Sequence, residues 1–301
     1  MSGARPAEPG LAYGAANGTG KPSRGAAFNL LQRAIDSGIA EFDTARAYGD
    51  REDRVEEALQ GHKVARSVTK LSPLAELSPN AMREEVRAAV DRSISESMIA
   101  LKRGRLDCLL LDCAAHMTAF EGAVWERLVE LLEDGTVLSL GVSVQSPAEA
   151  MAALDNPDVQ HLQLPFNLLD WRWRQSAVID RIRARPHLTI YARSVFLQGV
   201  LASCDPGIWP EIDGVDPADT IALIAAQVRE FGRESAADLC LAFVRGQDWI
   251  DGVVVGMETE DQLETNLQLF VRPPLTALEC EEVERRMPKL PEQLLNPGLW
   301  P

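Results

Sequence analysis

The chain has 301 residues, 46% of them hydrophobic, which is enough to build the core of one large domain. Its formal charge of −15 argues against nucleic acid or an anionic membrane as the main partner, because both require a basic face. The five cysteines are scattered, with no Cys-x-x-Cys pair and no histidine at metal-ligand spacing, so we expect reduced thiols and no metal site.

The sequence has no run of about 18 apolar residues and no signal or transit pattern at its start. We therefore expect a cytoplasmic protein, a monomer or a small homo-oligomer, whose partner is a small-molecule substrate.

Short β-type runs alternate with longer helical runs, which is typical of repeated βα units and a parallel sheet. Strands are expected at residues 41–42 and 65–69. Residues 80–102 carry apolar side chains every three or four positions, which predicts one long helix. Residues 106–111 are apolar except for Asp107, which predicts a strand buried on both faces.

The same alternation continues to residue 269. Further helices are expected at residues 123–133, from Ser146 and Pro147 onward, and at 171–184, 217–230, 235–247 and 259–269. Further strands are expected at residues 137–142, 161–164, 188–192 and 252–255.

Together with an irregular or shortened first strand at residues 10–13, this order predicts an α/β fold, a (β/α)8 TIM barrel in a single domain over residues 11–301. We expect residues 1–10 to be disordered and the Pro-rich tail, 288–301, to cross the barrel surface as extended chain.

Catalytic groups in such barrels follow the C-terminal ends of the strands. Asp43 and Tyr48 follow the strand at 41–42, and Lys70 follows the strand at 65–69. A lysine held by a carboxylate keeps its charge, and that charge lowers the pKa of a nearby phenol, so Tyr48 becomes a candidate general acid or base. The structural alternative is that Asp43 caps a helix and Lys70 is a surface lysine.

The stretch 42–59, with DTARAYGD followed by a short charged helix ending in EAL, resembles the active-site signature of the aldo-keto reductases. Thr69-Lys70, LSLGVS at 138–143, QLPFNLLD at 163–170 and GVVVG at 252–256 match later strands of that family in the same order.

The resemblance implies an NAD(P)H cofactor bound across the barrel mouth, with hydride passing to or from a carbonyl or alcohol. It implies Tyr48 as proton donor, tuned by Asp43 and Lys70. The positions that match cofactor contacts are Ser143 and Gln163 for the carboxamide, Arg193 against the nicotinamide ring, Ser194, Leu197 and Gly199 near the pyrophosphate, and Gly256, Gln262 and Asn266 near the adenosine. The structural alternatives are that Gln163 only satisfies polar groups inside the barrel and that Asn167 is a turn residue.

The chain departs from the family pattern at Asp112, which stands where a typical member carries a catalytic histidine at the end of the fourth strand. His116 follows four residues later. A branch of the family that reduces enones resembles this arrangement, with glutamate at that position. A buried carboxyl beside Asp43 would have a raised pKa and would donate a hydrogen bond to a substrate oxygen.

Two further departures concern the cofactor. The first strand matches the family poorly. The adenosine end carries Glu258, Glu260, Asp261 and Glu264 around Gln262, where NADPH-selective members often have arginine, so the preference for or against a 2′-phosphate stays open and NADPH is not indicated.

Three functions compete. The leading one is a nicotinamide-dependent oxidoreductase acting on a carbonyl, an alcohol or an activated alkene of a small metabolite. The second keeps the barrel for non-redox acid–base chemistry by Tyr48 and Asp112: elimination, cyclisation or epimerisation. The third is a catalytically degenerate barrel that only binds a ligand or partner.

Overall fold

The structure is a computed structural model that describes residues 22–49, 51–62, 65–175 and 177–301. The predicted first strand at 10–13 and the segment 1–10 lie outside the described residues. No helix in the described ranges is long and apolar enough to cross a membrane. The described residues group into two compact units, which we call the N-terminal unit (Arg24–Leu164 with Asp180–Ile190) and the C-terminal unit (Pro165–Ile179 and Tyr191–Pro301).

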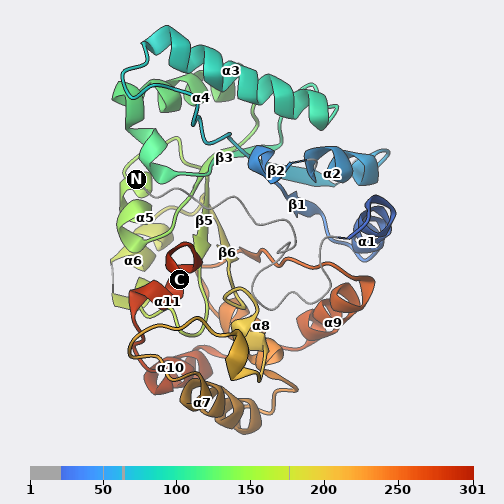
Figure 1. The fold of residues 1–301 in the computed structure, drawn as a ribbon, viewed down its shortest axis with the longest axis vertical. Helices are drawn as coiled ribbons and strands as arrows, with labels where there is room; N and C mark the ends of the chain where they lie inside the picture. Colours follow the sequence, from blue (N-terminus) through green and yellow to red (C-terminus); the bar gives the residue numbers. More distant parts are fainter. Residues whose placement is uncertain (1–21, 50, 63–64, 176) are drawn as a thin grey trace. The chain divides into compact units, whose positions relative to one another are not determined.

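The N-terminal unit alternates strands and helices as predicted (Figure 1). Its strands are β1 (Glu41–Asp43), β2 (Arg66–Lys70), β3 (Cys108–Leu111), β4 (Leu140–Ser143) and β5 (His161–Pro165), which extends one residue beyond the unit. Its helices are α1 (Arg24–Asp36), η1 (Arg46–Tyr48), α2 (Arg51–Leu59), α3 (Arg83–Ala100), η2 (Ala114–Met117), η3 (Ala119–Gly122), α4 (Ala123–Glu133), α5 (Pro147–Leu154) and, from Asp180 onward, α6 (Val178–Arg183).

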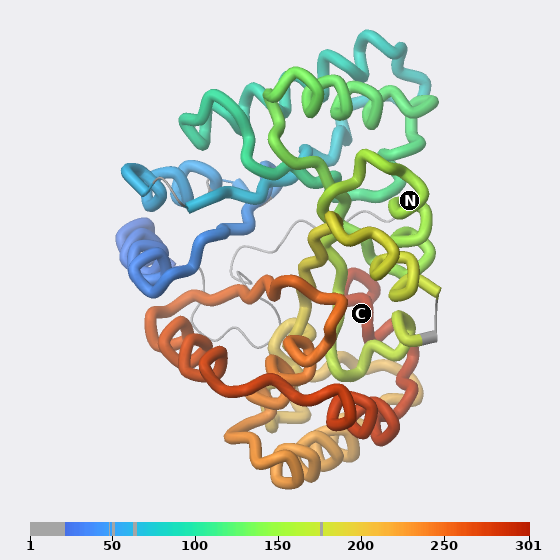
Figure 2. Tube along the Cα trace, turned by 180° about the vertical axis from the view of Figure 1, so that it is seen from behind, coloured from blue at the N-terminus to red at the C-terminus, as the bar shows by residue number. Residues whose placement is uncertain are grey.

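The five strands are parallel and pair in chain order. Both faces of β3 are buried, as its continuous apolar sequence predicts for a parallel sheet covered by helices. On one face, Val68, Cys108 and Leu110 form an apolar cluster. Helices α3 and α4 lie side by side in both views (Figures 1 and 2).

Strands β4 and β5 approach too closely for a side chain at Gly141. A Cβ atom there would lie 2.2 Å from the carbonyl oxygen of His161 and 2.7 Å from a methyl carbon of Leu110. Glycine at this position therefore sets the register in which Ser143 pairs with Gln163.

In the C-terminal unit, β6 (Thr189–Arg193), whose first two residues belong to the other unit, pairs in parallel with β7 (Gly252–Val253). Its helices are η4 (Trp173–Gln175), η5 (Val200–Ala202), η6 (Pro206–Ile208), α7 (Pro217–Glu230), α8 (Ala236–Arg245), α9 (Glu260–Val271), α10 (Ala277–Arg286), α11 (Glu292–Leu295) and η7 (Pro297–Leu299). Three of these helices begin after a residue type that favours the N-cap position. The side chains of Asp216, Ser235 and Thr259 each accept a hydrogen bond from the backbone N–H of the third residue after them.

Two predictions for this part of the chain are wrong. The helix expected at 171–184 is interrupted, because the buried Asp170 carboxylate accepts hydrogen bonds from the Arg172 backbone and the Trp173 indole, which holds the chain in a turn. The tail is not extended either: it contains α11 and η7, and Leu294 and Leu295 are fully buried.

Candidate active site

A buried ion pair lies at the ends of the first two strands. The Lys70 Nζ lies 2.6 Å from the Asp43 Oδ1 and also donates to the Thr44 carbonyl at 3.1 Å. Lys70 is only 3% exposed, and burying an ammonium group is unfavourable unless such partners surround it. Val68 and Lys70 share a face of β2, and Asp43 is in register with Val68, which lets the lysine reach the carboxylate across the sheet.

The second oxygen of Asp43 is bonded to the sheet as well. Gln163 Nε2 donates to Asp43 Oδ2 at 2.8 Å, so Gln163 does satisfy a polar group inside the sheet. Its Oε1 atom has no hydrogen-bond partner among the described residues, nor does the hydroxyl of Ser143. Ser143 and Gln163 are buried, register partners on β4 and β5, and their two open oxygens suit the amide donors of a carboxamide group.

Tyr48 ends η1, five residues after Asp43. The backbone before it is attached to β2, because the Thr44 N–H donates to the Val68 carbonyl at 2.8 Å. Behind the sheet, Glu52 accepts from Arg46 at 3.0 Å and from Thr69 at 2.7 Å. The hydrogen bond that Arg46 donates to Glu52 raises the pKa of Arg46, burial opposes this shift, and the charges of Glu52 and Glu96 add to it.

The structure corrects one expectation about Asp112. Its side chain is exposed rather than buried, because the residue lies just beyond β3 at the start of the turn into η2. Its carboxylate forms no hydrogen bond within the described ranges. Burial lowers the pKa of the nearby His116, and the charge of Asp112 opposes that shift. The argument that burial keeps Asp112 protonated therefore does not hold here.

In the C-terminal unit, residues 194–199 form a tight turn after β6. Ser194, Leu197 and Gln198 have φ values of 60°, 45° and 57°, and Gly199 has 88°. Leu197 N–H donates to the Ser194 carbonyl at 2.9 Å. Non-glycine residues in the left-handed region are strained, and such strain is common at ligand-binding turns.

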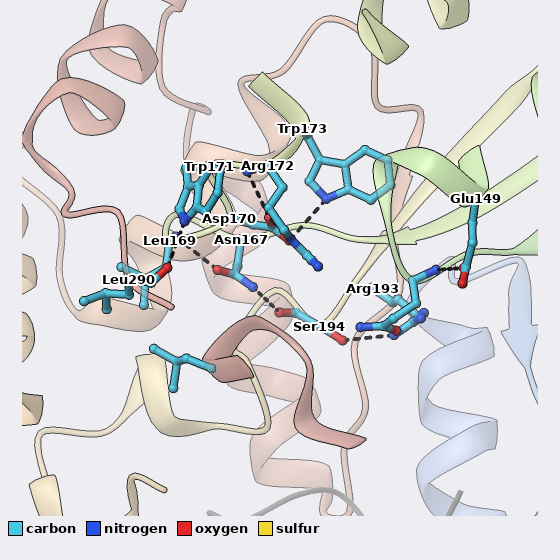
Figure 3. A network of polar contacts seen from close by, with 12 residues as sticks. Glu149, Asn167, Leu169, Asp170, Trp171, Arg172, Trp173, Arg193, Ser194 and Leu290 are labelled. Atoms are coloured by element: carbon cyan, nitrogen blue, oxygen red, sulfur yellow. Dashed lines mark hydrogen bonds and ion pairs between the residues drawn. The ribbon is translucent and has the colours of Figure 1, made fainter. Parts of the chain in front are cut away.

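Asn167 fixes this turn from the neighbouring segment (Figure 3). Its Nδ2 donates to the Ser194 carbonyl at 3.3 Å, and its Oδ1 accepts from the Leu169 N–H at 3.0 Å. The guanidinium of Arg193 is half-buried and donates to the Ser194 hydroxyl at 3.4 Å. Asn167 is thus a turn residue, which was the structural alternative for this position. Both the nitrogen and the oxygen of its side-chain amide form hydrogen bonds.

At the start of α9, Gln262 is an exposed helix-capping residue. Its N–H donates to the Thr259 hydroxyl at 3.2 Å, and its side-chain oxygen accepts from the Glu258 N–H at 2.6 Å. Gly256 is exposed and Asn266 half-buried in the same segment. The acidic residues of the sequence surround this helix start, and its first turn contains no basic residue.

The sequence reasoning did not identify Glu52, Arg46 or Thr69. No periodic pattern marks them, because Glu52 and Thr69 are 17 positions apart and meet only when α2 packs on β2. The sequence feature that could have pointed to Glu52 is its place as a charged residue at the second position of the short helix α2. No group of three or more metal-ligating side chains occurs in the part of the chain that the structure describes.

The comparisons with known proteins agree on one family. The model of the Aldo/keto reductase family matches residues 10–286. The structure is similar to aldo-keto reductase AKR11C1 from Bacillus halodurans in its holo form, with a TM-score of 0.72, 19% identity and 91% of each chain covered.

A second solved structure, MGS-M4, an aldo-keto reductase enzyme from a Medee basin deep-sea metagenome library, matches with a TM-score of 0.63 and 15% identity over 88% of this chain and 87% of that one. A third, Gox0644 in its apo form, matches with a TM-score of 0.64 and 20% identity over 89% and 86%. The fold is therefore the aldo-keto reductase fold, in which seven parallel strands with helices are consistent with the predicted (β/α)8 barrel.

Proposed function

Because the chain belongs to the aldo-keto reductase family, a family of oxidoreductases, we propose that it is a nicotinamide-dependent enzyme acting on a carbonyl, an alcohol or an activated alkene of a small metabolite. The observation that carries the proposal is the buried Lys70–Asp43 pair with Tyr48 in the turn that follows Asp43. A purely structural lysine has little reason to be buried at the end of a strand, whereas an acid–base site needs a charge held in that place.

In this proposal Tyr48 donates a proton to the substrate oxygen during reduction and removes it during oxidation. Asp43 supplies the counter-charge to the buried Lys70, and the ammonium charge favours the phenolate form of Tyr48. Gln163 holds the second oxygen of Asp43 and so fixes the direction of the carboxylate. NAD(P)H, when bound, supplies or accepts the hydride.

The residues present fit such a cofactor. The open oxygens of Ser143 and Gln163 suit the carboxamide of nicotinamide. Within the C-terminal unit, the strained turn 194–199 is proposed to contact the pyrophosphate, because backbone strain of this kind is common at ligand-binding turns. Arg193, Gly256, Gln262 and Asn266 remain proposed contacts to the ring and the adenosine end.

The test is a fluorescence titration of the purified protein with NADH and NADPH, followed by turnover of a panel of aldehydes, ketones and enones. We expect saturable binding of at least one cofactor. Tyr48→Phe should reduce turnover by about 10²–10⁴-fold and leave cofactor affinity nearly unchanged. Retention of more than half of the wild-type rate would remove Tyr48 from the mechanism.

One observation favours a second candidate, non-redox acid–base chemistry. Asp112 presents an exposed carboxylate, which forms no hydrogen bond with the described residues, at the strand end where a typical member carries histidine. Absence of binding at millimolar NADH and NADPH would favour this candidate if Tyr48 and Asp112 variants still abolish a reaction. With no reaction at all, a catalytically degenerate binding protein would be indicated.

A further inference from the structure

Glu52 is a fully buried carboxylate that joins two segments of the N-terminal unit. It is 0% exposed and lies in the first turn of α2. Its Oε1 accepts from the Thr69 hydroxyl of β2 at 2.7 Å, and its Oε2 accepts from the Arg46 guanidinium of η1 at 3.0 Å. Burying a carboxylate is unfavourable unless its oxygens are bonded, so these two contacts determine where Glu52 can lie.

The two segments are those that carry the proposed acid–base pair. Thr69 directly precedes Lys70, and the alternation of a strand sends the two side chains to opposite faces of β2. Lys70 therefore meets Asp43 on one face while Thr69 meets Glu52 on the other. Arg46 begins η1, and Tyr48 ends it.

The turn is thus attached to β2 from both faces. On the Lys70 face, Thr44 accepts from the lysine and donates to Val68. On the Thr69 face, the attachment found among the described side chains passes through Glu52. The other contact of Arg46, with Glu96 at 3.4 Å, is to a carboxylate that is 48% exposed, and an exposed pair holds a side chain weakly.

We propose that Glu52 is a positioning residue, which holds the η1 turn against β2 and thereby fixes the place of Tyr48 relative to Lys70. The inference rests on the proposed function, because it takes Tyr48 as the acid–base group. Glu52 itself touches neither substrate nor cofactor in this proposal. Its effect on the reaction passes through the place of the η1 backbone that carries Tyr48.

Thr69→Val is the sharpest test, since it removes only the hydroxyl that Glu52 binds and keeps the shape of a fully buried side chain. Thr69→Ser restores the hydroxyl and serves as the conservative rescue. Glu52→Gln removes the charge. The matched control is Asp238→Asn: Asp238 is a 1% exposed carboxylate in the first turn of α8, paired with Arg233 and Arg272, and lies in the C-terminal unit.

The readout is the pKa of the Tyr48 phenol in the cofactor-free protein, followed by ¹³Cζ-tyrosine NMR. The chain has three tyrosines, Tyr13, Tyr48 and Tyr191, so single Tyr→Phe variants assign the signals. We expect Thr69→Val and Glu52→Gln to raise that pKa by about one unit, because the phenol moves away from Lys70. In active enzyme, kcat should fall about tenfold with KM changing less than about threefold.

Thr69→Ser and Asp238→Asn should keep the wild-type phenol pKa. Folded Thr69→Val protein with an unchanged phenol pKa overturns the inference and leaves the proposed function standing. If Glu52→Gln does not fold, Thr69→Val alone decides. A wild-type Tyr48 that titrates at the ordinary value near 10 would overturn the coupling of Tyr48 to Lys70, and with it both the acid–base assignment and the role of Glu52.

Discussion

Asp43→Asn should destabilise the protein and disable the site at once. The carboxylate now accepts from Lys70 at 2.6 Å and from Gln163 at 2.8 Å. Asparagine has one oxygen, so it can accept from one of the two donors and must direct an amide donor at the other. If Gln163 turns its own amide to accept, its Oε1 is no longer open to a carboxamide.

The magnitude follows from the burial of the pair. Removing one partner of a buried ion pair costs about 3–5 kcal/mol. The Asp43 side chain is 19% exposed and asparagine keeps one acceptor, so we expect about 2–3 kcal/mol of lost stability. For a chain of this size that corresponds to a decrease in Tm of about 3–5 °C. Lys70, now without its counter-charge, should deprotonate more readily, which removes the charge that favours phenolate at Tyr48.

Thermal unfolding at pH 7 and steady-state turnover measure the two effects. Asp91→Asn is the matched control: Asp91 also accepts from a cation, Arg127, at 2.7 Å, but is 46% exposed. That change should cost at most about 1 kcal/mol and leave turnover intact. The reasoning would be refuted if Asp43→Asn unfolded at the same temperature as Asp91→Asn, because the buried pair would then contribute no more than an exposed one.

Three further predictions concern the cofactor, the altered strand end and pH. NADPH should have little or no advantage over NADH, because the first turn of α9 around Gln262 is acidic; a hundredfold preference, about 2.7 kcal/mol, would contradict this. Asp112→Asn should lower turnover at least about tenfold. Its free energy of unfolding should change by less than about 0.5 kcal/mol, since the carboxylate is exposed and forms no hydrogen bond with the described residues. Asp112→His should restore some carbonyl reduction, and full activity of Asp112→Asn would exclude a catalytic role. Burial lowers the pKa of His161 to about 4, below its ordinary 6.5. Between these two pH values the histidine is protonated in the unfolded chain but not in the folded one. Up to about 3 kcal/mol of stability is therefore lost as the pH falls from 6.5 to 4. Urea unfolding at pH 7 and 4.5 should show a smaller loss in His161→Gln than in wild type or in the exposed control His187→Gln, and equal losses would show that His161 is not the group responsible.

The strands could be predicted because their signal is local. The run that ends at Leu111 is apolar over four consecutive positions, and the observed strand Cys108–Leu111 coincides with it. The helix at 171–184 could not, because its periodicity is overridden by the hydrogen bonds of the Asp170 carboxylate.

The site divides in the same way. Asp43 and Lys70 follow strands that neighbour each other in a parallel sheet, so their proximity could be inferred from the order of elements alone. The exposure of Asp112 depends on how the chain turns after β3, and the burial of Glu52 depends on how a helix packs behind a strand. The exposure of Asp112 and the burial of Glu52 produce no recognisable sequence pattern, because tertiary contacts determine both.

Register is the physical condition on which the proposed chemistry depends. Lys70 pairs with Leu110, and Asp43 pairs with Val68, which puts the lysine and the carboxylate on one face and Thr69 on the other. A slip of one residue in β2 would turn Lys70 toward the helices and Thr69 toward Asp43, exchanging the two sets of contacts. Each face holds a buried acid with its own cation or donor, so such a slip would leave two carboxylates with the wrong neighbours. The same charged residues, Lys70, Asp43 and Glu52, therefore also favour the register of β2 on which the proposed site depends.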